Sequence, residues 1–215
     1  MLSNYPYPEN ISLHIMGIPI KKSQLEGIYR LISSTIEISQ SEWEYYSPMF
    51  EVRSIKKKEM LLREGEICQS VFFVNKGLLR VYFNDNHGEE LTFYFTQEND
   101  LASDYGSLLQ QSPSSYNIQA MEDTEVVVWS VQMIQDGFQH LRFADKLGRI
   151  LIEKYFILFS QKIQSLYTKK PLERYNEMNQ LFPSLLSRVP QHYIASYLNI
   201  SSVHLSRLKS KSWKK

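Results

Sequence analysis

The sequence predicts an α+β protein, in which an antiparallel β-roll is followed by one long helix and then by a C-terminal all-α domain. Three observations predict this order. Short strand-like segments separated by turn residues fill the region from about Glu51 to Ser130. A proline-free segment with helical spacing of apolar residues follows at 143–168. Two short helical patterns then close the chain. The 215 residues, 43% hydrophobic and 22% charged, are typical of a folded protein with one or two cores.

Residues 1–22 are rich in Pro, Asn and Ser and have no clear period, so we expect a loosely attached arm. The arm lacks a basic start followed by an apolar core, which argues against a signal peptide. No apolar run in the chain approaches the roughly 18 residues needed to span a membrane. Helical spacing then extends from about Ser23 to Phe50, where Ser41 and Glu44 match a capping box. We predict that 23–142 is one domain, made of the roll and flanking helices.

Segments rich in β-branched and aromatic residues predict the strands of the roll, at 70–74, 78–83, 90–95, 116–120 and 124–130. Gly77 and Gly88 fall between them, and we expect both to supply the positive φ that tight hairpins require. Cys68 is the only cysteine, which excludes an intramolecular disulfide and a cysteine-based zinc or iron–sulfur site within one chain. We expect it to be a small buried apolar residue in a protein of the reducing cytoplasm.

The segment 143–168 predicts a single long helix with two apolar stripes. The first stripe is Ile152, Phe156, Phe159, Ile163 and Leu166, and the second is Leu147, Leu151, Tyr155 and Leu158. One stripe can cover the roll, and the other then needs a further partner, most simply the same helix of a second subunit. The alternative, that both stripes serve one large core, stays open at this stage.

The segment 169–215 predicts a separate helical domain, with Pro171 in the first turn of its first helix. It holds nine basic and two acidic residues, so it carries a formal charge of +7 in a chain whose net charge is +1. Such a basic end indicates a polyanionic partner.

The stretch 189–211 has the pattern of a helix-turn-helix. The residues expected to face inward are Ile194, Ala195, Leu198, Leu205 and Leu208. Asn199 tolerates the left-handed conformation of a tight corner, and Ser201 or Ser202 can cap the second helix, which we expect to run from about Ser202 to Lys209. In this motif the second helix enters the major groove of DNA.

Arg207 is the residue of this helix that can best read a base, because its guanidinium can donate two parallel hydrogen bonds to guanine. The candidate DNA-binding residues are Gln191, Ser201, Ser202, Val203, His204, Ser206, Arg207, Lys209 and Lys211. Two alternatives stay open: an ordinary helical hairpin with a solvated basic face, and a module that binds a partner protein.

Three segments together resemble the Crp–Fnr family of bacterial transcription regulators. They are LLREGEICQSVFFVNKGLLRVYF, NDLASDYGSLL followed by YNIQAMEDTEVVVWS, and RVPQHYIASYLNISSVHLSRLKSK. The resemblance extends from about Ser23 onward, and its last segment is similar to the form common in the Bacteroidetes. It implies a cyclic-nucleotide-binding-type jelly roll and a cytoplasmic homodimer that is joined along the long helix. It also implies that double-stranded DNA with a palindromic operator is the partner and that the chain is not an enzyme.

The same resemblance implies RNA polymerase as a further partner, although the sequence does not locate a surface for it. Members of this family typically read DNA through a Glu and an Arg four positions apart. Those positions here are Val203 and Arg207. We therefore do not expect the family's usual operator sequence, and Val203 can instead contact a thymine methyl group.

The family's nucleotide cassette uses a Gly-Glu pair for the ribose and an Arg-Ser pair for the cyclic phosphate. The effector-pocket positions of this sequence are Ser103, Asp104, Ser114 and Ser115. Because no arginine is present to match the phosphate, we predict no useful binding of cyclic AMP or cyclic GMP, and we predict no cofactor.

Two alternatives remain for the roll. One is a regulator that responds to a nucleotide or another small molecule through a divergent pocket. The other is a cupin-like metalloenzyme, which the sequence disfavours because His87 is the only histidine in the roll and it lies in a turn. We predict neither a metal site nor catalytic residues.

Overall fold

The computed structural model describes residues 21–212, with the side chains of residues 211 and 212 left out. Almost all of the expected N-terminal arm, 1–22, therefore lies outside the described residues. Among the described helices, none combines the length and the apolar composition that crossing a membrane requires.

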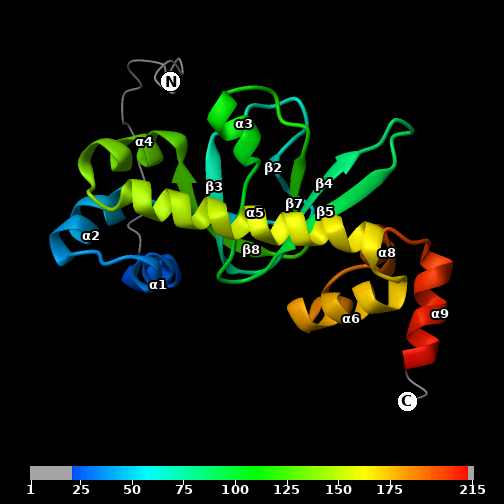
Figure 1. Cartoon of the computed structure of the whole chain (residues 1–215). Coiled ribbons are helices and arrows are strands. Elements are labelled where there is room, and N and C mark those ends of the chain that lie inside the picture. The colour runs from blue at the N-terminus through cyan, green and yellow to red at the C-terminus, as the bar shows by residue number, and fades with distance from the viewer. Residues whose placement is uncertain (1–20, 213–215) are drawn as a thin grey trace.

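Helices flank a roll of strands on two sides (Figure 1). The α-helices are α1 (Glu26–Thr35), α2 (Gln40–Tyr46), α3 (Tyr105–Gln110), α4 (Val131–His140), α5 (Ala144–Thr168), α6 (Pro171–Leu181), α7 (Leu185–Arg188), α8 (Gln191–Tyr197) and α9 (Ser202–Ser212). The strands are β1 (Glu51–Ile55), β2 (Met60–Leu62), β3 (Ser70–Lys76), β4 (Leu79–Asn84), β5 (Glu90–Thr96), β6 (Leu101–Ala102), β7 (Asn117–Ala120) and β8 (Thr124–Ser130).

The strands form two antiparallel four-stranded sheets, in the orders β1-β8-β3-β6 and β2-β7-β4-β5. The predicted α+β class and all five predicted strands are confirmed. Gly77 and Gly88 have the expected positive φ, at 105° and 79°. Only Gly88 lies in a hairpin, between β4 and β5; the hairpin expected at Gly77 is wrong, because β3 and β4 belong to different sheets. Gly77 also has no room for a side chain, because an added Cβ would lie 2.4 Å from Oγ1 of Thr124.

Both faces of the β1-β8-β3-β6 sheet are buried, which explains why β3 is apolar without alternation. Phe72 and Val128 point into the interior of the roll. Phe73 and Trp129 point to the outer face, where α1, α2, α4 and the first half of α5 cover them. The interior core continues into the C-terminal helices, which contribute residues such as Phe182 and Leu205.

The helix cap predicted at Ser41 and Glu44 is wrong by two residues. Ser39 is the N-cap of α2, and its Oγ accepts a hydrogen bond from the backbone N–H of Glu42. The Glu42 carboxylate accepts the backbone N–H of Ser39 at 2.8 Å, so the capping box is complete there. Both spacings satisfy the sequence pattern, so the pattern alone does not distinguish them.

Candidate nucleic-acid interface and effector cassette

The helix-turn-helix corner forms as the sequence predicts. Asn199 has φ of 51°, in the left-handed region, and the N–H of Ile200 returns to the carbonyl of Ala195 at 3.0 Å. Ser201 Oγ accepts the N–H of His204 at 3.2 Å and so caps α9. The residues predicted to face inward, Ile194, Ala195, Leu198, Leu205 and Leu208, are all buried.

The outer face of α9 carries the predicted base-reading side chains. Val203 is 62% exposed, and His204, Ser206 and Arg207 are also exposed. A shallow pocket is lined by Val203, His204 and Arg207, so these three side chains share one surface. The helix continues past the predicted end at Lys209 to Ser212.

The other predicted DNA-binding positions surround this face. Gln191, Ser201 and Ser202 are exposed at the starts of α8 and α9, and Lys209 is half-buried. The side chain of Lys211 lies outside the described residues.

Two basic side chains donate hydrogen bonds to the carbonyl end of α8, next to the corner. Lys162 of α5 donates from Nζ to the carbonyl of Tyr197 at 3.1 Å, and Arg174 of α6 donates to the carbonyl of Leu198 at 3.2 and 2.9 Å. Positive charge is favourable at this end of a helix. Burial, reinforced by the nearby Arg174, lowers the pKa of Lys162 to about 7. Side chains from α5 and α6 thus hold the end of α8 at the corner.

α8 also docks on the outer face of the roll, against β5. Ser196 Oγ accepts the N–H of Thr92 at 2.8 Å and donates to the carbonyl of Glu90 at 3.1 Å. The Tyr197 ring lies 5.6 Å from Phe95 and 6.0 Å from Phe182. Sequence reasoning missed this contact, because nothing in the local pattern connects α8 to a strand about a hundred residues earlier.

A buried arginine lies under the docked helix. Arg80 stacks between the rings of Tyr82 and Tyr193, at 4.2 and 3.8 Å from the ring centroids. Its Nε donates to Thr92 Oγ1 at 2.8 Å, and its Nη1 pairs with Glu90 at 2.5 Å. Because the side chain of Arg80 is fully buried, the stack depends on α8 staying in place.

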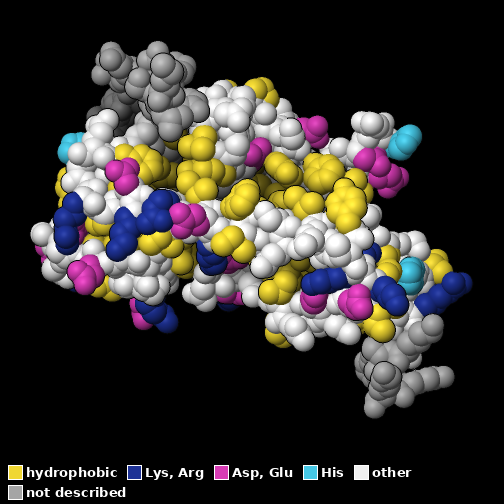
Figure 2. Space-filling view, in the orientation of Figure 1, with side chains coloured by type: hydrophobic (Ala, Val, Ile, Leu, Met, Phe, Trp, Pro, Cys, Tyr) yellow, Lys and Arg dark blue, Asp and Glu magenta, His cyan; other side chains and the backbone are white. Residues whose placement is uncertain are grey.

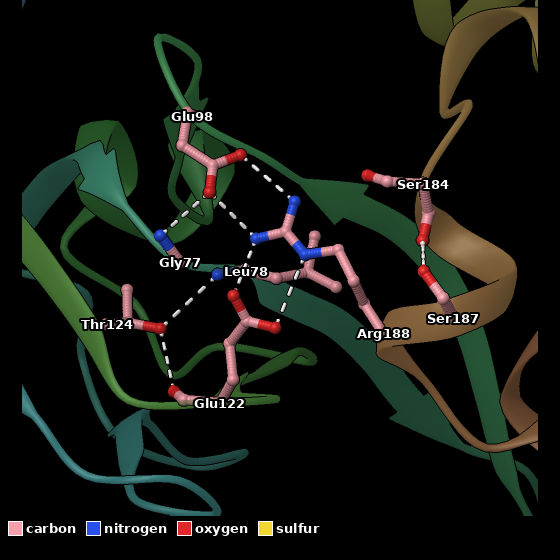
Figure 3. A network of polar contacts seen from close by, with 8 residues as sticks. All are labelled: Gly77, Leu78, Glu98, Glu122, Thr124, Ser184, Ser187 and Arg188. Carbon is pink, nitrogen blue, oxygen red and sulfur yellow. Dashed lines mark hydrogen bonds and ion pairs between the residues drawn. The ribbon is translucent and has the colours of Figure 1, made fainter.

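A second link joins the short helix α7 to the roll (Figure 3). Arg188 donates to both carboxylate oxygens of Glu98, at 3.0 and 2.8 Å, and to Glu122, at 3.3 and 2.7 Å. Glu98 also accepts the N–H of Gly77. Burial by itself would raise the pKa of Glu98, but the hydrogen bonds from Arg188 and from the backbone N–H groups of Glu98 and Gly77, together with the charge of Arg188, lower that pKa. The two carboxylates together raise the pKa of Arg188.

The basic C-terminal end is therefore only partly available to an outside partner. Arg188 is paired with the roll, Arg174 with backbone carbonyls, and Lys169 with Glu177. Arg207 remains exposed on α9, and none of the hydrogen bonds seen in the described part of the chain uses its guanidinium. The charge excess of this segment therefore overstated how many of its cations can reach a polyanion.

The long helix α5 leaves an apolar surface uncovered. Leu147, Leu151, Tyr155 and Leu158, the second predicted stripe, lie against the chain's own core. In the first stripe Ile152, Phe156 and Ile163 are 42%, 71% and 50% exposed. Hydrophobic side chains accordingly gather along this helix in Figure 2. The alternative of a single core for both stripes is wrong within this chain.

Three of the four predicted cassette side chains, those of Ser103, Asp104 and Ser114, are already hydrogen-bonded within the chain. Asp104 is buried as the N-cap of α3, where it accepts the N–H of Ser107, and its other oxygen accepts Ser114 Oγ–H at 2.7 Å. Ser103 Oγ donates to the carbonyl of Ser70, and Ser115 is exposed. The structure thus brings the predicted cassette residues Asp104 and Ser114 together, but the two side chains hydrogen-bond to each other.

Aromatic rings occupy the space between the cassette and α5. Phe93 lies 5.4 Å from Tyr116 and 4.9 Å from Phe159 of α5, and Phe83 lies 6.0 Å from Tyr116. His87 lies at the exposed turn between β4 and β5, with its N–H bonded to Asp85, so it does not face the roll interior. The rings of Phe93, Tyr116 and Phe159 thus pack the roll against α5.

Comparisons with known proteins agree with this architecture. Residues 52–140 match the family model described as a cyclic nucleotide-binding domain. No curated protein sequence matches the chain. The structure of FixK2 from Bradyrhizobium japonicum is similar with a TM-score of 0.65 at 20% identity, covering 76% of this chain and 84% of that one.

Two further solved structures show the same likeness. A putative transcriptional regulator of the Crp–Fnr family from Eubacterium rectale has a TM-score of 0.64 at 15% identity, covering 80% of this chain and 82% of that one. The c-di-GMP-responsive global regulator CLP of Xanthomonas campestris has a TM-score of 0.61 at 14% identity, covering 82% and 92%. The resemblance found in the sequence is thus confirmed: residues 52–140 form a cyclic nucleotide-binding-type domain, and the chain has the fold of the Crp–Fnr transcription regulators.

Proposed function

We propose that the chain is a homodimeric DNA-binding transcription regulator of the Crp–Fnr type, in which α9 enters the major groove. One observation carries this proposal. α9 buries Leu205 and Leu208 against the rest of the chain, while Val203 and Arg207 stay exposed on one surface. A helix so positioned can present a bidentate donor to guanine and an apolar group to thymine. If DNA is the partner, we expect the chain to act in the cytoplasm and to be a regulator instead of an enzyme.

A second copy of the chain supplies the missing cover for α5. The uncovered residues recur at helical spacing along one side, as Ile152, Phe156 and Ile163. Two such helices lying side by side would bury this stripe and relate two copies of α9 by a two-fold axis. The operator is then expected to be palindromic. Sedimentation velocity tests the assembly: Phe156→Asp should turn dimer into monomer.

The hydrogen-bonded cassette argues against cyclic AMP and cyclic GMP as effectors. A cyclic phosphate would need a cation at Ser114, yet this hydroxyl is already bonded to the carboxylate of Asp104. Adding a phosphate beside that carboxylate would bring two negative charges together. Calorimetry with both nucleotides should show no binding, and low-micromolar binding of either nucleotide would refute this part of the proposal.

DNA binding is tested by a mobility-shift assay with the gene's own upstream DNA at two salt concentrations. Affinity should fall steeply with salt, because phosphate contacts release counterions. Arg207→Ala should weaken specific binding by about 1–3 kcal/mol. The matched control is Arg30→Ala, which removes an exposed arginine from α1, far from α9 in Figure 1. Equal effects of the two substitutions, or salt-independent binding, would reject the assignment.

A further inference from the structure

A cavity of about 300 Å³ lies outside the roll, between the first half of α5, the helix α4 and the outer face of the β1-β8-β3-β6 sheet. Its floor includes Val71 and Trp129. Strand alternation separates this site from the roll interior, because Phe72 and Val128, the neighbours of those two residues, point inward. The cavity is therefore on the other side of the sheet from the interior of the nucleotide-binding-type roll.

The walls of the cavity are apolar, and several polar groups in them already have partners. Trp129 Nε1 donates to the Tyr46 hydroxyl at 2.7 Å, and that hydroxyl donates to the carbonyl of Met133 at 2.8 Å. The Tyr155 hydroxyl is bonded to Asp100 and accepts the N–H of Leu101. These groups have no need of a ligand's hydrogen bonds. A charged or strongly polar molecule would lose its hydration here without compensation.

The size of the cavity is that of a ligand site and not of an ordinary packing defect. Protein cores are close-packed, and voids much larger than a water molecule are few. Pockets that hold small molecules start at about 300 Å³ and are mostly lined by hydrophobic and aromatic side chains. Apolar cavities stay dry and take up apolar molecules.

The mouth of the cavity lies beside the uncovered stripe of α5. Ile152 and Phe156 belong both to the cavity lining and to that stripe. A partner helix on the stripe would cover the mouth, whereas the floor at Val71 and Trp129 lies on the sheet beneath α5. We therefore expect a small molecule to contact Val71 and Trp129 inside the cavity, and the second subunit to cover its mouth.

We propose that this cavity binds a small uncharged apolar molecule, aromatic or alkyl in class, held between α4, α5 and the outer face of the β1-β8-β3-β6 sheet. This inference goes beyond the proposed function, since DNA reading by α9 requires no ligand here. The occupied cavity would brace α5 against the roll at the point where the second subunit packs.

Titration of the full chain with the uncharged dye N-phenylnaphthylamine, whose emission rises in apolar surroundings, tests the site. We expect saturable binding of one dye per chain by the dimer. Gly148→Leu should weaken it by about tenfold or more, because position 148 lines the cavity and a side chain added there points toward Phe138, 3.5 Å from the Cβ. Gly148→Ala should give a smaller loss and a helix at least as stable as the wild type.

The control is Tyr167→Ser, which removes an 86% exposed ring from the far end of the same helix. It should keep wild-type dye binding. Absence of binding by the wild-type dimer would overturn the proposal, since partner side chains would then fill the cavity. Equal binding by Gly148→Leu, or equal loss with Tyr167→Ser, would overturn it too. None of these results depends on DNA, so failure here and failure of the proposed function are distinguishable.

Discussion

Arg188 and Glu98 stand 90 residues apart in the sequence and are joined by two parallel hydrogen bonds, from Nη1 to Oε2 at 3.0 Å and from Nη2 to Oε1 at 2.8 Å. This bidentate geometry is the strongest that an arginine and a carboxylate can form. Glu122 shares the same guanidinium, so one cation ties α7 to two loops of the roll. The orientation of the helix-turn-helix therefore depends on the roll as well as on α5.

Arg188→Ala should lower the free energy of unfolding by about 2 kcal/mol, because it leaves Glu98 and Glu122 close together with no cation between them. Urea denaturation measures the change. Arg149→Ala is the matched control: its exposed pair with Glu153 on α5 should be worth no more than about 0.5 kcal/mol. Similar losses in both variants would show that the Arg188 network contributes no more than a surface pair.

The same network should weaken in acid. The pKa of Glu98 is lowered in the folded state, so its contribution is complete above the ordinary carboxyl value of 4.5 and is lost as the pH falls through the lower, folded value. The difference in unfolding free energy between the wild type and Arg188→Ala should be constant from roughly pH 6 to 8 and shrink below roughly pH 4. A difference that grows in acid would contradict the assignment of the pair.

Lys162 should give the stability a second dependence on pH, of the same sign, at neutral to alkaline pH. Its folded pKa of about 7 lies below the ordinary value of 10.5, so the unfolded chain holds a proton that the folded chain has released between these two values. Stability then rises with pH across this window, by at most about 1.4 kcal/mol per unit.

Lys162→Met lacks this gain, so its stability relative to the wild type should be most favourable below pH 7 and decline as the pH rises toward 10. Urea unfolding at several pH values measures the trend. Lys146→Met, at an exposed position of the same helix, should follow the wild-type profile. Parallel curves for wild type and Lys162→Met would mean that the amine is not buried against α8.

Gly77→Ala should destabilise the chain by about 2 kcal/mol or more, because the backbone has φ of 105° and the new Cβ would clash with Thr124 at 2.4 Å. Gly65→Ala is a matched comparison, with φ of 87° and nothing within 4 Å of the added carbon. It should cost only about 1 kcal/mol. Thermal unfolding of the two variants separates the steric contribution from the conformational one.

Val203→Glu should change which base is read without abolishing DNA binding. A carboxylate on the exposed face of α9 accepts a hydrogen bond from cytosine N4, whereas valine contacts a thymine methyl group. Selection of binding sites from randomised DNA should show thymine replaced by cytosine at one position of each half-site. Unchanged preferences at every position would place Val203 outside the groove.

The strands and the corner of the helix-turn-helix were predictable because their signals are local. Segments rich in β-branched and aromatic residues, bounded by Gly77 and Gly88, indicate β3, β4 and β5, and Asn199 indicates the corner. The short strands β1, β2 and β6 were not predicted as separate elements. β6 spans only Leu101–Ala102. It is a strand because it pairs with β3, and its composition alone does not predict one.

The docking of α8 could not be predicted, because it rests on pairs distant in the chain. Ser196 gives no sign in the sequence that it will bond the backbone of Glu90. Arg188 was likewise counted with the charges available to a polyanion, although two carboxylates of the roll neutralise it. The candidate site residues of α9 and the division into domains stay predictions that the experiments above address.

The aromatic contact among Phe95, Phe182 and Tyr197 means that the roll and the C-terminal helices share one uninterrupted interior. Heating should accordingly give a single cooperative calorimetric transition instead of two. A fragment ending at Thr168 would leave the rings of Tyr94 and Phe95 bare, and the excised 169–215 piece would lose the wall that orders it. The roll and the C-terminal helices are therefore expected to unfold together.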